Sequence, residues 1–180
     1  LVFQGDTDIA LERSVLSAED LETIASADGV ADSYGVGHAI VTVDSTAEEF
    51  DARVFGLSDR FEQLPTVEGT VEPGPGEAVV DVVAKTDGVR LGDRLHLTPI
   101  DRELEVVGFT EGRRYVMAPV IYVDMETWEA IYVASALGRM TSVDDDDREA
   151  AVSIEQRVGE GMSGGASIAA VELKPGVTSE

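Results

Sequence analysis

The protein has 180 residues, of which 43% are apolar, 36 are acidic and 13 are Lys or Arg, so its formal net charge is −23. A chain of this length suits one domain or two small lobes. Its charge excludes nucleic acid and argues against an anionic membrane surface, because both are bound through Lys and Arg. The sequence holds no Cys, which excludes disulfides and thiolate sites, and no run of 18 apolar residues that would span a membrane.

The first residues predict two short strands and a helix. Residues 1–4 and 9–16 have strand-like patterns. Ser17 is a good N-cap, and Asp20, three residues later, completes a capping box. A helix is therefore expected over residues 18–28, ended by the glycine that follows in a left-handed C′ position.

A β-hairpin is expected next. Residues 36–43 alternate between two faces, the chain turns at 44–47, and residues 49–57 return. Residues 58–76 hold three of the six prolines and predict an ordered loop that crosses to a second lobe.

The following stretch predicts a small, twisted β module, because short strands come in quick succession. They are expected at residues 77–85, 94–99, 103–111 and 118–125. Asp124 is then the N-cap of a helix over residues 125–137.

The last part of the chain is less regular. Residues 138–166 are acidic and rich in Gly, so we expect a mobile segment with a short helix near 147–158. A strand is expected over 166–173. The sequence begins without Met and ends at residues 178–180, which are typical of a helix start, so we expect it to be part of a longer protein.

Motifs for catalysis or metal binding are weak. His38 and His96 lie in alternating strands without a second ligand at a suitable spacing. Residues 161–165 (GMSGG) are interpreted as a flexible loop, and residues 143–147 (VDDDD) lack the Gly and Glu of a calcium loop. We therefore predict no catalytic residue, no metal site and no cofactor.

One short segment is a candidate surface for a partner or ligand. Arg113 and Arg114 form one of the few basic spots in the sequence, and Tyr115 and Met117 follow them closely. We expect these four residues at an exposed hairpin tip, where an aromatic side chain beside a cation suits docking.

The segment GVRLGDRLHL, residues 88–97, predicts a structural turn. Gly92 supplies a backbone conformation that other residues disfavour, and Asp93 can bond backbone amides of the turn. Neither residue is expected to take part in a reaction.

The order of these segments resembles a known family, the extracytoplasmic domain of FtsX-like ABC-transporter permeases that contain the MacB-type core domain. The resemblance covers most of residues 10–135 and 167–180, whereas 138–166 has no counterpart in it. It is carried by RSVLSAEDLETIASADGV, ARVFGLSDRF followed by VEGTVEPGPGEAVVD, GVRLGDRLHL, ELEVVGFTEGRRYVMAPVIYVDMETWEAI and IAAVELKPGVTSE.

This resemblance implies an α+β fold with two lobes. Residues 1–62 and 135–180, from both chain ends, would form a porter-like α/β lobe. Residues 63–134 would form an inserted, smaller β-rich lobe.

It also implies a function without chemistry in this domain. The domain would lie on the extracytoplasmic side of the cell membrane, joined to it by flanking helices that this chain lacks. It would transmit the motion driven by a cytoplasmic ATPase subunit to a substrate or partner, within a permease that dimerises. The alternative is a free-standing secreted module that binds a ligand or protein. An enzyme would need a pocket that joins His38 or His96 to a nucleophile.

The acidic composition indicates a salty environment. Lys85 and Lys174 are the only lysines, while Asp and Glu are abundant. Such a chain repels itself in dilute buffer, but the Debye length falls to about 3 Å at 1 M salt, which screens the repulsion. We expect a halophilic protein.

If the protein is halophilic, its melting temperature will rise steeply between dilute and molar KCl, because added salt screens the repulsion within the folded state. Thermal unfolding followed by circular dichroism at several KCl concentrations measures this. A melting temperature that does not change with KCl would contradict the hypothesis.

Overall fold

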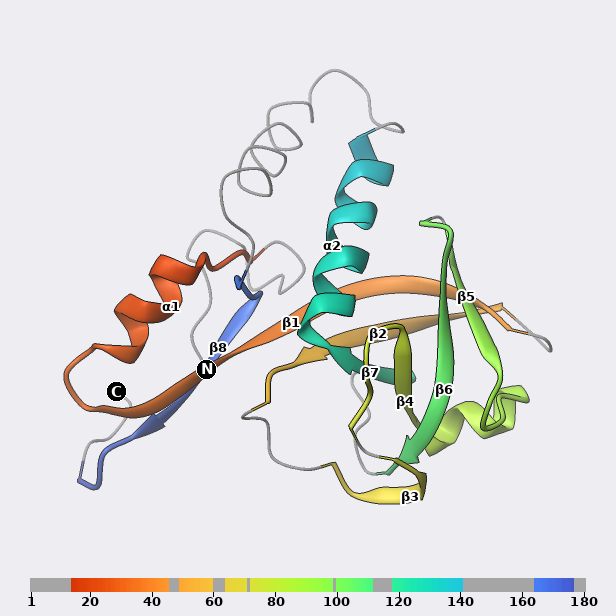
Figure 1. Ribbon diagram of the computed structural model, residues 1–180, viewed down its shortest axis with the longest axis horizontal. Coiled ribbons are helices and arrows are strands. Elements are labelled where there is room, and N and C mark those ends of the chain that lie inside the picture. Colours follow the sequence, from red (N-terminus) through yellow and green to blue (C-terminus); the bar gives the residue numbers. More distant parts are fainter. Residues whose placement is uncertain are drawn as a thin grey trace.

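One mixed sheet and two α-helices make up the part of the chain that the computed structural model describes, residues 14–45, 49–59, 64–70, 72–98, 100–111, 118–140 and 164–176 (Figure 1). This arrangement confirms the predicted α+β class. The elements are α1 (Ala18–Ala25), β1 (Val30–Asp44), β2 (Glu49–Leu57), β3 (Thr66–Gly69), β4 (Glu77–Asp81), the 3₁₀ helix η2 (Val82–Asp87), β5 (Arg94–Thr98), β6 (Arg102–Thr110), β7 (Val120–Asp124), α2 (Met125–Met140) and β8 (Ile168–Leu173).

Six of the strands close into a ring. β1 pairs with β2, β2 with β7, β7 with β4, β4 with β6, β6 with β5, and β5 again with β1. The pairs β2–β7 and β4–β6 are parallel and the others are antiparallel. Inward side chains alternate with outward ones, as in β5, where Leu95 and Leu97 are fully buried. The ring therefore encloses a side-chain core, as small barrels do.

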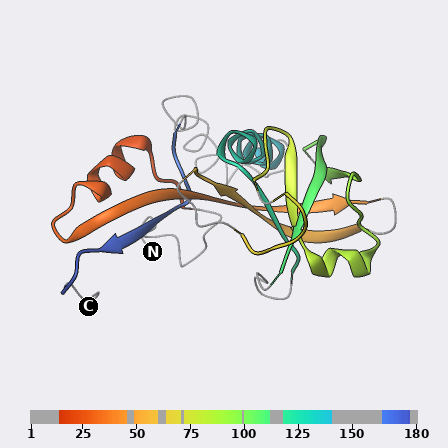
Figure 2. The same ribbon diagram turned by 60° about the horizontal axis from the view of Figure 1, so that its bottom comes forward.

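β1 extends beyond this ring and changes partners along its length. Its first half, up to Val36, pairs with β8, and its second half pairs with β2 and β5. Figure 2 shows the result: α1 and β8 lie at one end of the molecule, the ring lies at the other, and β1 runs through both. The predicted boundary between residues 62 and 63 stays a prediction, but β1 and β2 on its first side are hydrogen-bonded into the same sheet as β4 to β7.

The predicted hairpin and both helix starts are confirmed. β1 and β2 are antiparallel, with Asp44 opposite Glu49 at the turn. The capping box of Ser17 and Asp20 is present. At the second helix, the Asp124 carboxylate accepts a hydrogen bond from the backbone N–H of Thr127 at 2.6 Å.

The ends of both helices differ from the prediction. α1 ends at Ala25 instead of residue 28, and Gly29, with φ +93°, serves the turn into β1 rather than a C′ position. α2 continues to Met140, so the start of the segment 138–166 is helical. Residues 141–163, with the expected helix near 147–158, lie outside the described residues, as do most of the two expected N-terminal strands.

Two predictions for the middle of the chain were wrong. The strand expected over 77–85 stops at Asp81, because its carboxylate accepts a hydrogen bond from the N–H of Val83 and begins η2. The loop expected over 58–76 contains β3, which pairs with β6. Both elements depend on local capping or distant pairing that alternation does not reveal.

The turn at Gly92 and Asp93 is confirmed. Gly92 has φ +84°, and the Asp93 carboxylate accepts a hydrogen bond from the N–H of Arg90 at 2.8 Å. The N–H of Gly92 donates to the carbonyl of Val106 in β6. The motif thus attaches the turn to the ring.

Trp128 of α2 sits on a pair of glycines. Gly37 in β1 and Gly56 in β2 are direct register partners. A Cβ atom at Gly37 would lie 2.1 Å from the indole ring, and one at Gly56 would lie 2.5 Å from the side chain of Trp128. Trp128 is 1% exposed, so the indole has no free space to move into. We call this contact the tryptophan seat.

Gly37→Ala should lower the free energy of unfolding by about 3 kcal/mol, because overpacking against a buried indole strains the core. Urea unfolding measures the change. Gly74→Ala is the control: its Cβ would be 3.2 Å from an oxygen at the flexible end of Glu77. Equal effects of the two substitutions would show that the seat is not tightly packed.

Candidate functional site

The surface predicted from the sequence lies outside the described residues. Arg113, Arg114, Tyr115 and Met117 fall between the end of β6 and Ala118, and the structure does not describe residues 112–117. Their role as a partner or ligand surface stays a prediction.

The two histidines are far apart. Asp44 of β1 is opposite His96, and His38 lies six residues before Asp44 on the same strand, which is about 20 Å along an extended chain. His38 is 1% exposed, and its ring packs 5.1 Å from the ring of Phe55. His96 is partly exposed, with Nε2 3.7 Å from a carboxylate oxygen of Asp101. The two imidazoles therefore cannot share a metal ion or act at one reaction centre.

Among the described residues, no group of three or more His, Asp or Glu side chains is placed to hold a metal ion. Within the same residues, no helix is both long enough and apolar enough to cross a membrane.

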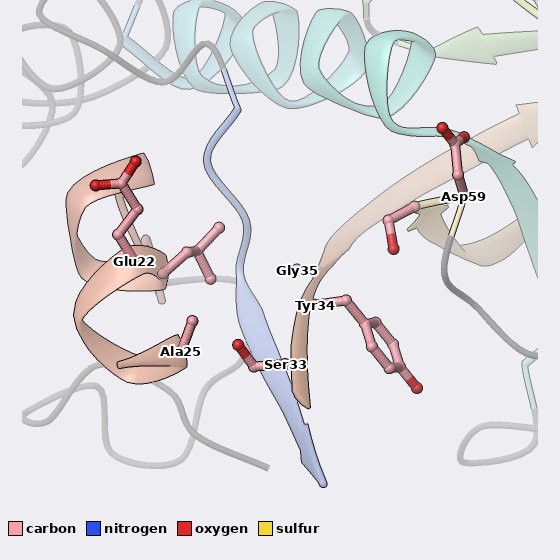
Figure 3. Close-up of a pocket in the computed structure, with 8 residues that line it drawn as sticks. Glu22, Ala25, Ser33, Tyr34, Gly35 and Asp59 are labelled. Carbon is pink, nitrogen blue, oxygen red and sulfur yellow. The ribbon is translucent and has the colours of Figure 1, made fainter. Parts of the chain in front are cut away.

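A first hollow lies between α1 and the middle of the molecule. Its volume is about 390 Å³. Figure 3 shows Glu22 and Ala25 of α1 on one side, and Tyr34 and Asp59 on the other, with β8 and β1 passing between them. Its lining residues come from α1, from β1 and from the residues that follow β2, and they are Leu21, Glu22, Ala25, Ser33, Tyr34, Gly35, Ser58 and Asp59.

A second, larger hollow lies beside α2. Its volume is about 730 Å³, and its lining comes from the start of β6, from residues 125–134 of α2 and from the residues before β8. The lining residues are Arg102, Met125, Glu126, Glu129, Ala130, Val133, Ala134, Gly164 and Gly165. Neither hollow was predicted from the sequence, because each joins segments that are distant in the chain. The spacing of Glu126 and Glu129 on one helix face was the one visible signal.

Ser167 replaces a missing strand partner at the junction of the two ends. β1 leaves β8 at Val36 and meets β5 only from Thr42. Between them, the Ser167 hydroxyl accepts a hydrogen bond from the N–H of His38 at 3.1 Å, and it lies 3.2 Å from the carbonyl oxygen of His38, to which it donates. Both residues are buried. One hydroxyl thus satisfies two backbone groups that would otherwise be lost in the interior.

Comparisons with known proteins identify the fold. No family model matches the sequence, and no curated protein matches it. The structure is similar to the extracellular domain of the ABC-type transporter YknZ from Gram-positive bacteria, with a TM-score of 0.50 and 13% identity over 88% of this chain and 89% of that one. The periplasmic region of MacB from Actinobacillus actinomycetemcomitans aligns with a TM-score of 0.49 and 14% identity over 87% of this chain and 78% of that one. The resemblance inferred from the sequence is therefore confirmed for the fold.

Ser167→Ala should lower the free energy of unfolding by about 2 kcal/mol, because it leaves the buried N–H and carbonyl of His38 without their partner. Ser26→Ala is the control. It removes an exposed hydrogen bond to the carbonyl of Glu22, so a change within about 0.5 kcal/mol is expected. Urea unfolding of both variants compares them, and similar losses would refute the bridging role.

Proposed function

We propose that this chain is the extracytoplasmic domain of an FtsX-like ABC-transporter permease and that it carries out no chemistry. One observation carries the proposal: the likeness in fold to the extracellular domain of an ABC-type transporter extends over 88% of the chain. The order of sequence motifs resembles the same family. The fold and the order of sequence motifs therefore both support the same family.

The arrangement of ionisable groups supports a role outside catalysis. A nucleophile needs a base within hydrogen-bond reach and a group that orients the base. His38 is buried against Phe55, and His96 lies on the outer face of β5 beside Asp101. Neither imidazole lines either of the two hollows.

The path of β1 supports a role in transmitting motion. This strand belongs to the ring at one end and to the α1–β8 pair at the other, so a displacement of one end is passed to the other through continuous backbone. The tryptophan seat holds α2 against β1 and β2 close to the point where β1 changes partners. A tightly packed contact of this kind transmits strain instead of absorbing it.

In this proposal the motion comes from outside the domain. A cytoplasmic ATPase subunit hydrolyses ATP, the membrane helices of a permease dimer move, and this domain carries the movement to a substrate or partner outside the cell. The domain itself needs no cofactor.

The proposal is tested in the parent complex, purified with its ATPase subunit and placed in lipid nanodiscs. Replacing residues 14–176 by a short Gly/Ser linker should leave basal ATP hydrolysis largely intact, because the motor is a separate subunit. It should abolish ATP-driven transport or partner activation. Both activities are measured on the same preparation.

A complex whose ATPase lacks its phosphate-loop lysine is the control and should lose both activities. Two results would overturn the proposal. One is a parent gene that encodes a signal peptide and this domain but no membrane helices, which would leave a secreted binding module. The other is full transport without the domain.

A further inference from the structure

The hollow beside α2 has the size of a small-molecule site. Its volume of about 730 Å³ falls within the range of about 300–1,000 Å³ that such sites occupy. Its long wall is one face of α2, where Met125, Ala130, Val133 and Ala134 present mainly hydrocarbon. All four side chains are partly buried and none is charged. This wall favours an apolar ligand group over a hydrated ion.

Two carboxylates lie within this wall, between Met125 and Ala130 along α2. Glu126 and Glu129 are three residues apart on α2 and therefore neighbours on its surface. Partial burial and, second, the negative charge of Glu126 raise the pKa of Glu129. A positive charge placed between the carboxylates would offset the repulsion between them and favour the charged form of Glu129.

The charge of the hollow is negative overall. Arg102 lines it as well, but among the described residues it forms no salt bridge with Glu126 or Glu129. Two carboxylates and one guanidinium leave a formal charge of −1. The whole chain, the hollow included, carries a formal net charge of −23. A charge of this sign repels anions and attracts cations.

We propose that this hollow binds an organic cation with an aliphatic body, of which a primary alkylamine is the simplest example. The ammonium group would lie at Glu126 and Glu129, and the chain would cover Ala130, Val133 and Ala134. A divalent metal ion fits less well, because it needs six or more oxygen ligands or a tight cluster, and the described residues hold no such cluster.

That the organic cation is the transported substrate rests on the proposed function. That the hollow binds such a cation does not depend on the proposed function. The hollow is lined by Arg102 of the ring, by α2 and by Gly164 and Gly165, which lead into β8. A ligand there would touch β6, α2 and the residues that lead into β8.

Isothermal titration of the full chain with octylammonium chloride, 1-octanol and sodium octanoate tests the inference. The three probes share one aliphatic chain and differ in charge. Octylammonium should bind at least about fivefold more tightly than octanol, as one charge-assisted contact allows, and octanoate should bind most weakly. The amine affinity should fall as the pH is lowered through the pKa of Glu129, because the neutral carboxyl group no longer attracts the ammonium.

Glu129→Gln keeps the shape of the side chain and removes its charge. It should weaken octylammonium binding about fivefold and leave octanol binding unchanged. Glu22→Gln is the matched control, because Glu22 lines the other hollow. Circular dichroism checks that both variants are folded.

Three results would overturn the inference: equal affinity for octylammonium and octanol, an octylammonium affinity that Glu129→Gln leaves unchanged, or an octylammonium affinity that Glu22→Gln lowers instead. These outcomes are separate from the test of the proposed function. If ATP-driven transport in the complex requires this domain but the domain does not bind octylammonium, only the inference about the hollow is wrong. If the domain binds octylammonium but transport does not require it, only the proposed permease role is wrong.

Discussion

The contact between one indole ring and two glycines determines how the parts of this protein fit together. Trp128 occupies the space above Gly37 and Gly56, where any side chain would collide with it. The two glycines face each other because both lie seven residues from the hairpin turn, Gly37 before Asp44 and Gly56 after Glu49. The seat therefore fixes α2 to the hairpin next to the point where β1 passes from β8 to the ring. Movement of any of these elements must disturb the same contact.

Local signals were sufficient for the elements whose stabilising contacts lie within a few residues. The capping box at Ser17, the N-cap at Asp124 and the turn at Gly92 depend on hydrogen bonds between residues at most three apart, and the structure has all three. The same kind of signal was missed at Asp81, where a cap begins η2 although the apolar pattern continues. Closure of the ring needs β5 beside β1 and β7 beside β2, and pairing over such distances leaves no trace in alternation.

The candidate sites were harder to predict, for a related reason. A basic, aromatic segment such as residues 112–117 is visible in a sequence because its residues are adjacent. The hollow beside α2 is not visible, because Arg102, α2 and Gly164 come together only when the sheet is complete. The seat lies between these cases: the hairpin register alone pairs Gly37 with Gly56, but nothing local shows that Trp128 covers them.

Negative charge alone would make this protein a weak and unselective binder of any cation. Salt screens such long-range attraction, and an exposed carboxylate contributes little to affinity. Selectivity requires a second feature that simple ions cannot use, and the aliphatic wall of α2 beside Glu129 provides one. Because that wall belongs to a helix held by the tryptophan seat, and the opposite wall leads into β8, a change in the relative position of the two ends would change the shape of the hollow. Linkage then requires the reverse effect as well: a ligand that fits one arrangement stabilises that arrangement over the other.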